Sequence, residues 1–409
     1  MKMEVSKVKG FQDVLPPESL KKARVKEVIE KWFRLYGFVP WETPVVEYDE
    51  LMRPDNLPSE GVDEAVSDRF KLQDRGGRNL GLRYEFTFQL SRILKENPNM
   101  KMPIKRYQIG EVFRDEPISA RRFRQLTQCD VDIIGDATIN PDAEVLACFA
   151  DILKELKVEF EIVVNNRKLL ESIIDSVEIQ NVKGVMRELD KMDKTGIDEV
   201  KANLRKYAEA NQIITLLRLL EKDLAFFKEN GFDGVDELVE LMELCKAYGV
   251  KINFNPGLIR GFGYYTGNVF EIRVKDSKDS IAGGGRYDKS VGKYLGREIP
   301  AVGISFGLER VTEMASVKMD GFPKVLILSI EQDLAAIKLV VKLRKEGISS
   351  GIDFRKVGKG MDYANAMKIP YVVFLGESEV GSKKYKLKNM ETGKEELLSE
   401  SGLIKKLGK

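Results

Sequence analysis

The most regular alternation of apolar and polar positions in the chain lies at residues 105–135. It predicts two strands joined by a short loop at residues 117–121. The apolar face carries Tyr107, Ile109, Phe113, Phe123, Val131 and Ile133. The other face carries mostly charged and amide side chains, namely Gln108, Arg114, Glu116, Arg122, Arg124, Leu126, Gln128, Asp130 and Asp132. Such a charged face is either a solvated sheet surface or a platform for an anionic ligand bound by planar arginines.

Before this hairpin, apolar residues first follow a helical period and then a strand pattern. The helical set is Val25, Val28, Ile29, Trp32, Phe33 and Tyr36. Gly37 follows where a glycine typically ends a helix, and the extended apolar stretch 38–46 then contains two prolines. Proline restricts such a strand to a sheet edge, which fits a subunit interface and an ordinary packed edge equally well.

Residues 80–92 are predicted to form another strand, with Arg83, Glu85 and Thr87 at alternate positions and therefore pointing to a shared site. A helix at 142–156 and a strand at 158–165 follow the hairpin. From 167 to 248 the strand signals vanish and leucine-rich helical segments dominate. This change predicts a helical insertion in a strand-rich domain.

Strand patterns return at residues 258–271, 281–288 and 300–307. The last of these leads into a helix whose first turn holds Arg310, near backbone N–H groups suited to anions. The run Gly283–Gly285 permits close approach of the backbone to a ligand, although a glycine run alone is a weak signal.

Beyond Pro323 the pattern is that of a separate α/β domain. Strands are predicted at 325–330, 348–354 and 371–375, with a helix at 331–345. Four lysines near its end form either a solvated face or a phosphate contact: Lys383, Lys384, Lys386 and Lys388.

Composition removes several kinds of chemistry. The chain of 409 residues has no histidine, which excludes Ser-His-Asp and Cys-His catalysis and histidine metal ligands. Its three separated cysteines predict neither a disulfide framework nor a CxxC zinc site and favour a reducing cytosol. Lys plus Arg number 67 against 65 for Asp plus Glu, so any contact with nucleic acid must use local patches. No apolar run of transmembrane length and no N-terminal signal pattern is found, so we expect no membrane association.

Five motifs in consistent order resemble those of the histidyl-tRNA synthetases, a family of class II aminoacyl-tRNA synthetases. Residues 37–44 resemble class II motif 1, the stretch from FRDE at 113–116 to Gln128 resembles motif 2, and residues 303–310 resemble motif 3. The sequences RGFGYYT at 260–266 and AGGGRYD at 282–288 are similar to signatures of the histidine enzymes. The combination is far more specific than any one motif and covers nearly the whole chain.

The resemblance implies an α+β catalytic domain built on an antiparallel sheet, a helical insertion domain and a C-terminal α/β anticodon-binding domain. Residues 1–166 and 251–321 would form the two parts of the catalytic domain, 167–250 the insertion, and 322–409 the anticodon-binding domain. It also implies a cytoplasmic homodimer, with motif 1 at the subunit interface.

The resemblance assigns roles to individual residues. Arg114 would hold the ATP α-phosphate and the substrate carboxylate, and Arg260 would lie across the α-phosphate, so these two are the expected catalytic residues. Both also belong to the expected histidine site. The other members of that site are Glu85, Thr87 and Gln128 for the ammonium group, and Asp132, Tyr264, Tyr265 and Tyr287 for the imidazole. The other ATP-site residues are Glu116 for the adenine amino group, Arg122 and Arg310 for the β- and γ-phosphates, Leu126 and Glu271.

The implied reaction has two steps. Histidine attacks the α-phosphorus of ATP to give histidyl-adenylate and pyrophosphate, and a ribose hydroxyl at the 3′ end of tRNA(His) then attacks the adenylate. Arginines and Mg²⁺ accompanying ATP would stabilise the phosphoryl charge, with no metal fixed by protein His or Cys. The required partners are L-histidine, ATP and tRNA(His).

Two positions depart from the family pattern. Leu126 stands where an aromatic residue usually stacks on adenine, and Gly263 replaces the usual Asp beside Arg260. These departures keep open a synthetase-like regulatory subunit of ATP phosphoribosyltransferase, which the retained catalytic arginines and C-terminal domain disfavour. A class II synthetase for another amino acid is disfavoured by the two histidine-type signatures. Arg121 is either a contact for the tRNA acceptor end or an ordinary exposed loop residue.

Overall fold

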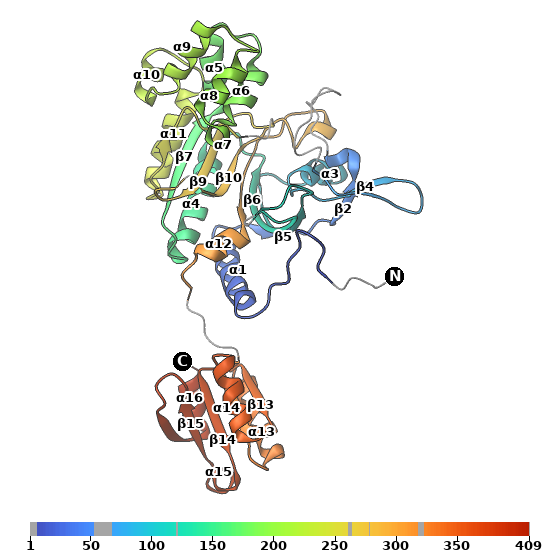
Figure 1. The fold of residues 1–409 in the computed structure, drawn as a ribbon, viewed down its shortest axis with the longest axis vertical. Coiled ribbons are helices and arrows are strands. Elements are labelled where there is room, and N and C mark those ends of the chain that lie inside the picture. The colour runs from blue at the N-terminus through green and yellow to red at the C-terminus, as the bar shows by residue number, and fades with distance from the viewer. Residues whose placement is uncertain are drawn as a thin grey trace. The chain divides into compact units, whose positions relative to one another are not determined.

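The computed structural model describes residues 6–52, 68–119, 122–260, 264–277, 279–317 and 323–408. Arg121 and Gly263 lie outside the described residues. Internal contacts divide the chain into two compact units, residues 1–317 and 318–409, which are described separately (Figure 1). The finer division into four parts stays a prediction.

A large sheet forms the centre of the first unit. Its strand order is β1-β5-β6-β11-β10-β9-β7-β8, and its pairs are antiparallel except β1 with β5 and β7 with β8. The bounds are β1 Val39–Pro40, β5 Ile104–Phe113, β6 Gln125–Ile134, β7 Phe160–Asn166, β8 Asn253–Phe254, β9 Asn268–Val274, β10 Ser280–Arg286 and β11 Ala301–Gly307. The predicted antiparallel sheet and the hairpin β5–β6 are confirmed, and β1 lies at the sheet edge. The strand expected at 258–271 begins only at Asn268.

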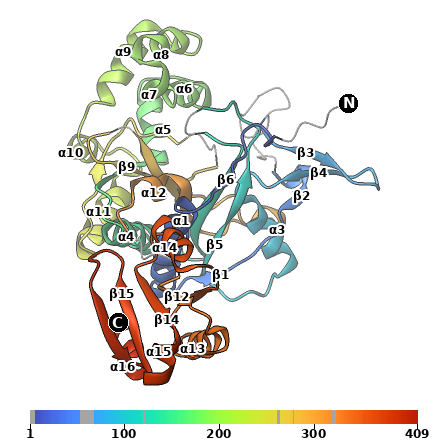
Figure 2. The same ribbon diagram turned by 60° about the horizontal axis from the view of Figure 1, so that its bottom comes forward.

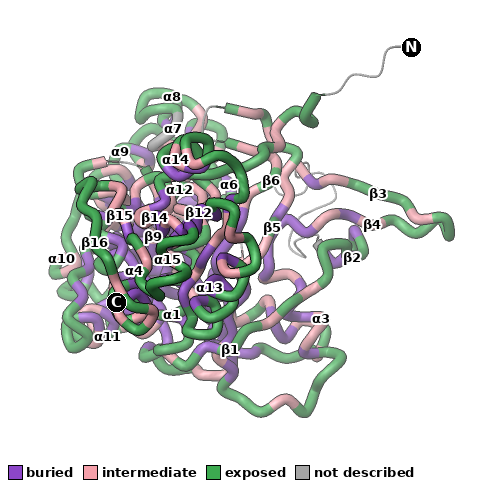
Figure 3. The backbone as a smooth tube through the Cα atoms, turned by 90° about the horizontal axis from the view of Figure 1, so that it is seen from below, coloured by how far each residue is buried: buried purple, intermediate pink, exposed green. Residues whose placement is uncertain are grey.

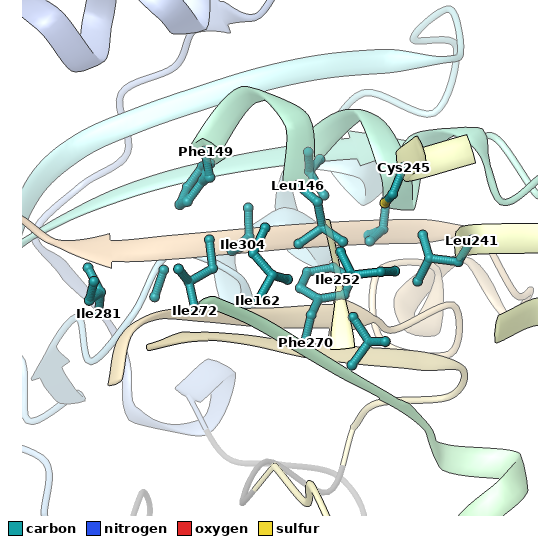
Figure 4. Packing of buried hydrophobic residues seen from close by; sticks show 14 of the residues in the cluster. Leu146, Phe149, Ile162, Leu241, Cys245, Ile252, Phe270, Ile272, Ile281 and Ile304 are labelled. Carbon is teal, nitrogen blue, oxygen red and sulfur yellow. The ribbon is translucent and has the colours of Figure 1, made fainter. Parts of the chain in front are cut away.

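One face of this sheet packs on helices. These are α1 Glu18–Leu35, α4 Asn140–Glu155, α11 Val235–Ala247 and α12 Leu308–Met314. Side chains of α4 such as Leu146 and Phe149 point to the strands, where they meet Ile304 and its neighbours (Figure 4). The rings of Phe149 and Phe306 stack with centroids 3.9 Å apart. Because strand residues alternate between faces, burial of Cys129, Val131 and Ile133 in this core turns the residues between them to the opposite face.

Six short helices follow β7 and lie at one end of the first unit (Figures 1 and 2). They are α5 Arg167–Ser176, α6 Val182–Leu189, α7 Met192–Thr195, α8 Ile197–Leu204, α9 Ala210–Leu219 and α10 Leu224–Glu229. The predicted change to helical structure is therefore confirmed. Their buried hydrophobic residues belong to the same hydrophobic core as the central sheet.

A smaller sheet precedes the first predicted site residues along the chain. It contains β2 Val46–Tyr48, β3 Lys71–Gln73 and β4 Asn79–Leu82, with a 3₁₀ turn, η1 Asp49–Met52, after β2. Figure 3 shows β3 as exposed. The strand predicted at 80–92 is wrong after Leu82, because helix α3 Phe88–Glu96 begins soon afterwards. Leu90 and Leu94, four residues apart, are both buried, and this helical spacing decides the structure.

The remaining short element of the first unit is η2 Lys293–Leu295. Among the described residues, every helix is too short or too polar to cross a membrane.

The second unit is the predicted α/β domain, with a five-stranded sheet of order β13-β12-β14-β15-β16. Its elements are β12 Val325–Ser329, α13 Asp333–Lys345, β13 Ser350–Asp353, α14 Val357–Ala366, β14 Tyr371–Leu375, α15 Glu377–Ser382, β15 Lys384–Asn389, β16 Glu395–Ser399 and α16 Glu400–Leu407. The first three strands of that order are parallel, and β15 and β16 add antiparallel. Lys386 and Lys388 of the lysine cluster pair with Glu395, at 2.8 and 3.7 Å.

Candidate active site

The candidate site lies on the face of the large sheet opposite the helical core. Cross-strand partners lie on the same face, so one row of partners brings together residues from five strands. That row runs Gln108, Asp130, Ser305, Gly283 and Glu271 across β5, β6, β11, β10 and β9. The neighbouring row of the same face runs Arg106, Asp132, Gly303, Gly285 and Val269. Residues next to motif 2, residues of motif 3 and residues of a histidine-type signature thus share one surface.

This charged face is not a solvated surface. Gln128, Asp130 and Asp132 are only 8, 6 and 3% exposed, and Arg106 is 0% exposed. Charges buried to this extent must be paired. Arg106 Nη2 lies 2.5 Å from Asp132 Oδ2, and the Tyr287 hydroxyl donates a hydrogen bond to Asp132 Oδ1. The interpretation as an ordinary solvated face is therefore wrong for these residues, whereas Arg122 at the end of the hairpin is exposed.

A group of three tyrosines connects two predicted histidine-site carboxylates. The Tyr264 ring lies 4.8 Å from that of Tyr265 and 5.8 Å from that of Tyr287, measured between centroids. The Tyr264 hydroxyl donates to Glu85 Oε2 at 3.4 Å, while Tyr287 contacts Asp132. Five of the residues assigned to histidine from the sequence therefore lie together.

Arg114 connects this group with the predicted adenine residue. Its Nη2 donates to Gln128 Oε1 at 3.3 Å, and its Nε donates to the Tyr84 carbonyl at 3.4 Å. The guanidinium also lies over the Tyr84 ring, 4.5 Å from the centroid. The Tyr84 hydroxyl donates to Glu116 Oε1 at 3.1 Å, so Arg114 stands between Gln128 and Glu116.

The second predicted catalytic arginine, Arg260, lies flat on strand β10. A Cβ atom at Gly283 would be 2.2 Å from Arg260 Nη1, so only glycine leaves room for the guanidinium there. Arg260 Nη1 is 3.6 Å from Glu271 Oε1, and Arg273 Nη2 is 2.8 Å from Glu271 Oε2. The glycine run forms part of a strand and not a turn.

A buried amide fixes the backbone before Arg260. Asn165 Nδ2 donates to the carbonyl oxygens of Pro256 and Leu258, at 2.9 and 3.0 Å. Asn165 is on β7, so the position of Arg260 depends on the sheet and not on local sequence alone.

Four other residues assigned to ATP or histidine make none of the contacts described above. Arg310 donates to the Ser280 carbonyl at 2.7 Å. Arg122 is exposed, and Leu126 is a half-buried residue of β6. Thr87 is at the N-cap of α3 without a side-chain capping bond. The prediction that Arg83 points with Glu85 and Thr87 from one strand is wrong.

Arg83 instead supports the backbone. It donates from Nε to the Glu111 carbonyl at 2.6 Å and from Nη1 to the Thr43 carbonyl at 2.8 Å. Its guanidinium packs on the Phe86 ring at 4.9 Å. The strand that would have aligned it with Glu85 ends at Leu82.

The buried carboxylates create a site suited to a cation. Burial, together with the nearby charge of Asp130, raises the pKa of Glu85 to about 8. Burial also raises the pKa of Asp130 to about 7 against the opposing effect of Arg106. The pKa of Asp132 is raised by burial, while Arg106 and the Tyr287 hydrogen bond act to lower it. A bound ammonium group would favour the ionised form of all three carboxylates.

Sequence reasoning assigned no role to three residues of this surface. Arg106 lies two residues before Gln108 and was not included in the charged face. Asp130 was placed on that face without a role, and Ser305 lies within motif 3. Alternation could place Arg106 and Asp130 on the correct face. The pairings with Asp132 and Ser305 require the tertiary structure.

Comparison with known proteins identifies the family. Residues 10–311 match the family model described as histidyl-tRNA synthetase, and residues 324–409 match that of an anticodon binding domain. This chain belongs to the histidyl-tRNA synthetase family. It is 37% identical to histidine–tRNA ligase 1 of Bacillus cereus over 96% of this chain and 95% of the relative.

Solved structures of histidyl-tRNA synthetases share the fold. The crystal structure of histidyl-tRNA synthetase from Nostoc sp. PCC 7120 matches with a TM-score of 0.87 and 26% identity, covering 99% of both chains. A structure described as an ATP phosphoribosyltransferase regulatory subunit/histidyl-tRNA synthetase from Bacillus halodurans matches with a TM-score of 0.74. Its identity is 22%, covering 89% of this chain and 96% of that one, and shows the fold alone. The α+β fold and family predicted from the motifs are confirmed.

Proposed function

We propose that this chain is a histidine–tRNA ligase, which joins L-histidine to tRNA(His) through a histidyl-adenylate formed from ATP. The observation that carries this proposal is the position of Arg114. It contacts Gln128, assigned to the amino acid, and Tyr84, which in turn contacts Glu116, assigned to adenine. The Arg114 guanidinium therefore lies next to both the assigned histidine site and the assigned ATP site. A group that brings the histidine carboxylate to the α-phosphate must have this position.

Histidine recognition rests on the buried carboxylates and tyrosines. Asp132 would accept a hydrogen bond from an imidazole N–H. Tyr287 and Arg106 each contact one of its two carboxylate oxygens, and each oxygen has a second lone pair with which to accept. The Tyr264 hydroxyl would serve the second ring nitrogen, with Tyr265 packed beside it. Such a site rejects analogues that lack the matching group, because its buried polar atoms would remain unpaired.

The ammonium and carboxylate groups of histidine would occupy the adjoining part of the site. Glu85, Thr87 and Gln128 would accept from the ammonium, and Arg114 would bind the carboxylate. The negative charge of the buried carboxylates supports binding of the ammonium group in this position.

In the first step, a histidine carboxylate oxygen forms a bond to the α-phosphorus of ATP. The bond from that phosphorus to the bridging oxygen of the β-phosphate breaks, and pyrophosphate leaves with the electron pair. Arg114 and Arg260 would stabilise the growing charge on the α-phosphoryl oxygens, and their fixed positions reduce the reorganisation needed. The carboxylate nucleophile is already ionised, so no general base is required.

At the nucleotide end, Glu116 would accept from the adenine amino group and Leu126 would pack on the base. Arg122 and Arg310 would bind the β- and γ-phosphates, with Glu271 beside Arg260. Within the described ranges, no group of three or more His, Cys, Asp or Glu side chains is arranged to hold a metal ion. Mg²⁺ would therefore be held mainly by the ATP phosphates, whose charge it would partly neutralise.

In the second step, the oxygen of a ribose hydroxyl at the 3′ end of tRNA(His) forms a bond to the carbonyl carbon of the adenylate and releases its proton. The bond from that carbon to the phosphate oxygen breaks, and AMP leaves with the electron pair. The C-terminal unit, which matches an anticodon binding domain, would contact the anticodon.

We further propose a cytoplasmic location, which the three free, buried cysteines support.

We also propose that the enzyme is a homodimer, joined through the segment that resembles motif 1. Large apolar side chains are exposed in this segment and on either side of it, with Leu35 65%, Val39 51% and Tyr48 53% exposed. Apolar exposure at a sheet edge supports burial against a second copy. A solution mass of one chain would contradict this part of the proposal.

The decisive experiment is histidine-dependent exchange of pyrophosphate into ATP by the purified protein, followed by charging of tRNA. Exchange that fails at every histidine concentration would contradict the ligase and favour the regulatory-subunit alternative. Arg260→Ala should reduce exchange to a small residual rate without changing the thermal unfolding curve. Full exchange by that variant would contradict the role assigned to Arg260.

A further inference from the structure

The side-chain amide of Gln128 has two chemically different ends, and its neighbours hold each end in a defined place. Gln128 Nε2 donates to Ser305 Oγ at 2.8 Å and lies 3.4 Å from Asp130 Oδ1. The Ser305 hydroxyl donates to the same Asp130 oxygen. At the other end, Gln128 Oε1 accepts from Arg114 Nη2 at 3.3 Å.

The direction of these hydrogen bonds follows from Asp130. An ionised carboxylate only accepts, so the Ser305 proton must point to Asp130. The lone pairs of Ser305 are then left to accept, and they require the NH₂ end of Gln128. The carboxamide oxygen is consequently turned the other way, towards Arg114. A hydrogen-bonded chain of this kind, buried from water, has one favoured polarity.

We propose that Asp130 is a positioning residue for substrate binding: acting through Ser305, it turns the oxygen of Gln128 towards the α-ammonium group. The inference rests on the proposed function, in which Gln128 contacts that group. Asp130 need not touch the substrate itself, because its contacts with Ser305 and Gln128 transmit its effect.

Charge in the pocket supports the same role. Asp130 and Asp132 occupy alternate positions of β6, and the charge of Asp130 acts on Glu85. These three buried carboxylates face two nearby guanidinium groups, those of Arg106 and Arg114, so the group carries a net negative charge when all are ionised. An ammonium group would neutralise it. Two donors aimed at one Asp130 oxygen oppose the effect of burial on its pKa and favour the ionised form, which the hydrogen-bond polarity requires.

The test compares two ligands that differ in the group concerned. Histidinol has the imidazole and the ammonium but no carboxylate, whereas imidazolepropionate has the imidazole and a carboxylate but no ammonium. In Asp130→Asn the new amide can donate a hydrogen bond to the Ser305 hydroxyl. That hydroxyl is then free to donate elsewhere, so the side-chain amide of Gln128 is no longer held in one orientation. We expect the Kd of histidinol, measured by calorimetry, to rise about tenfold, the usual effect of one hydrogen bond to a charged group. The Kd of imidazolepropionate should change by less than about twofold.

A matched pair at position 305 tests the relay without changing the charge of Asp130. Ser305→Ala removes the hydroxyl and should weaken histidinol selectively, whereas Ser305→Thr keeps the hydroxyl and should retain most of the affinity. If Asp130→Asn does not fold, as judged by thermal unfolding, this pair decides the question by itself.

The outcomes separate the inference from the proposed function. Equal weakening of both ligands by Asp130→Asn, or no weakening of either, would overturn the positioning role. Equal histidinol affinities in the two Ser305 variants would overturn it as well. Failure of the unaltered protein to bind histidinol or to catalyse histidine-dependent exchange would instead overturn the proposed function.

Discussion

Gly283 offers a direct test of how Arg260 is positioned, because its lack of a side chain makes room for the guanidinium. In Gly283→Ala the new Cβ would lie 2.2 Å from Arg260 Nη1 and 2.3 Å from Cζ and Nη2. Nonbonded heavy atoms normally approach to about 3.5 Å, so the guanidinium must move by more than about 1 Å. The atoms concerned form the flexible end of an arginine, so the side chain can yield while the fold is retained.

The expected effect follows from that displacement. Misplacement of a catalytic group by about 1 Å typically lowers the rate about 100-fold, equivalent to about 2.7 kcal/mol of transition-state stabilisation. The free energy of unfolding should change by less than about 1 kcal/mol, because Gly283 lies in a strand and Gly→Ala there restricts the unfolded chain. Activity and stability should therefore separate clearly.

The assay is the rate of histidine-dependent pyrophosphate exchange for Gly283→Ala, Arg260→Ala and the double variant. If the alanine acts only by displacing Arg260, the double variant should be no slower than Arg260→Ala alone. Urea denaturation of each variant serves as the control for folding. Normal exchange by Gly283→Ala, or a further 100-fold loss in the double variant, would refute the reasoning.

Three further predictions concern the buried polar groups. Tyr287→Phe removes the hydroxyl that donates to Asp132. It should raise the KM for histidine about tenfold and leave kcat nearly unchanged. A fall in kcat with an unchanged KM would contradict this. Arg286→Met leaves the buried carboxylate of Asp142 without its ion-pair partner. It should lower the free energy of unfolding, measured by urea denaturation, by about 3–5 kcal/mol. An unchanged free energy of unfolding would contradict this prediction. Because the pKa of Glu85 is raised to about 8 in the folded protein, the folded state binds more protons than the unfolded state between the ordinary glutamate value and that pH. The stability of the ligand-free protein should therefore fall as pH rises through this range. In Glu85→Gln the melting temperature should depend less on pH between about pH 5 and pH 8. The same dependence of melting temperature on pH in both proteins would contradict the raised pKa of Glu85.

Elements with a strong internal pattern could be predicted from the sequence. The alternation at residues 105–135 gave the correct hairpin, because successive side chains of any strand point to opposite faces whatever the strand packs against. The strand ending at Gly307 and the helix after it were also predicted correctly. The pattern failed after Leu82, where the spacing of Leu90 and Leu94 favoured a helix over the alternation of Arg83, Glu85 and Thr87.

The sequence also determined which chemistry is available. Without histidine, any catalysis must rely on carboxylates, arginines, lysines, tyrosines and the substrates, and the ordered motifs indicated which of these to consider. The family and fold predicted from the motifs agree with the comparisons. The roles of individual site residues stay predictions, although most of the residues assigned to histidine lie together.

Only the tertiary structure decided how the charged face is used. The sequence left open whether that face is solvated, and burial of Arg106 against Asp132 answers the question. Asp130 and Ser305 are 175 residues apart, and they meet only because β6 and β11 are neighbours in the sheet. Alternation along one strand fixes the face on which a side chain lies, but it contains no information about which distant strand will pair beside it. The site depends on that pairing.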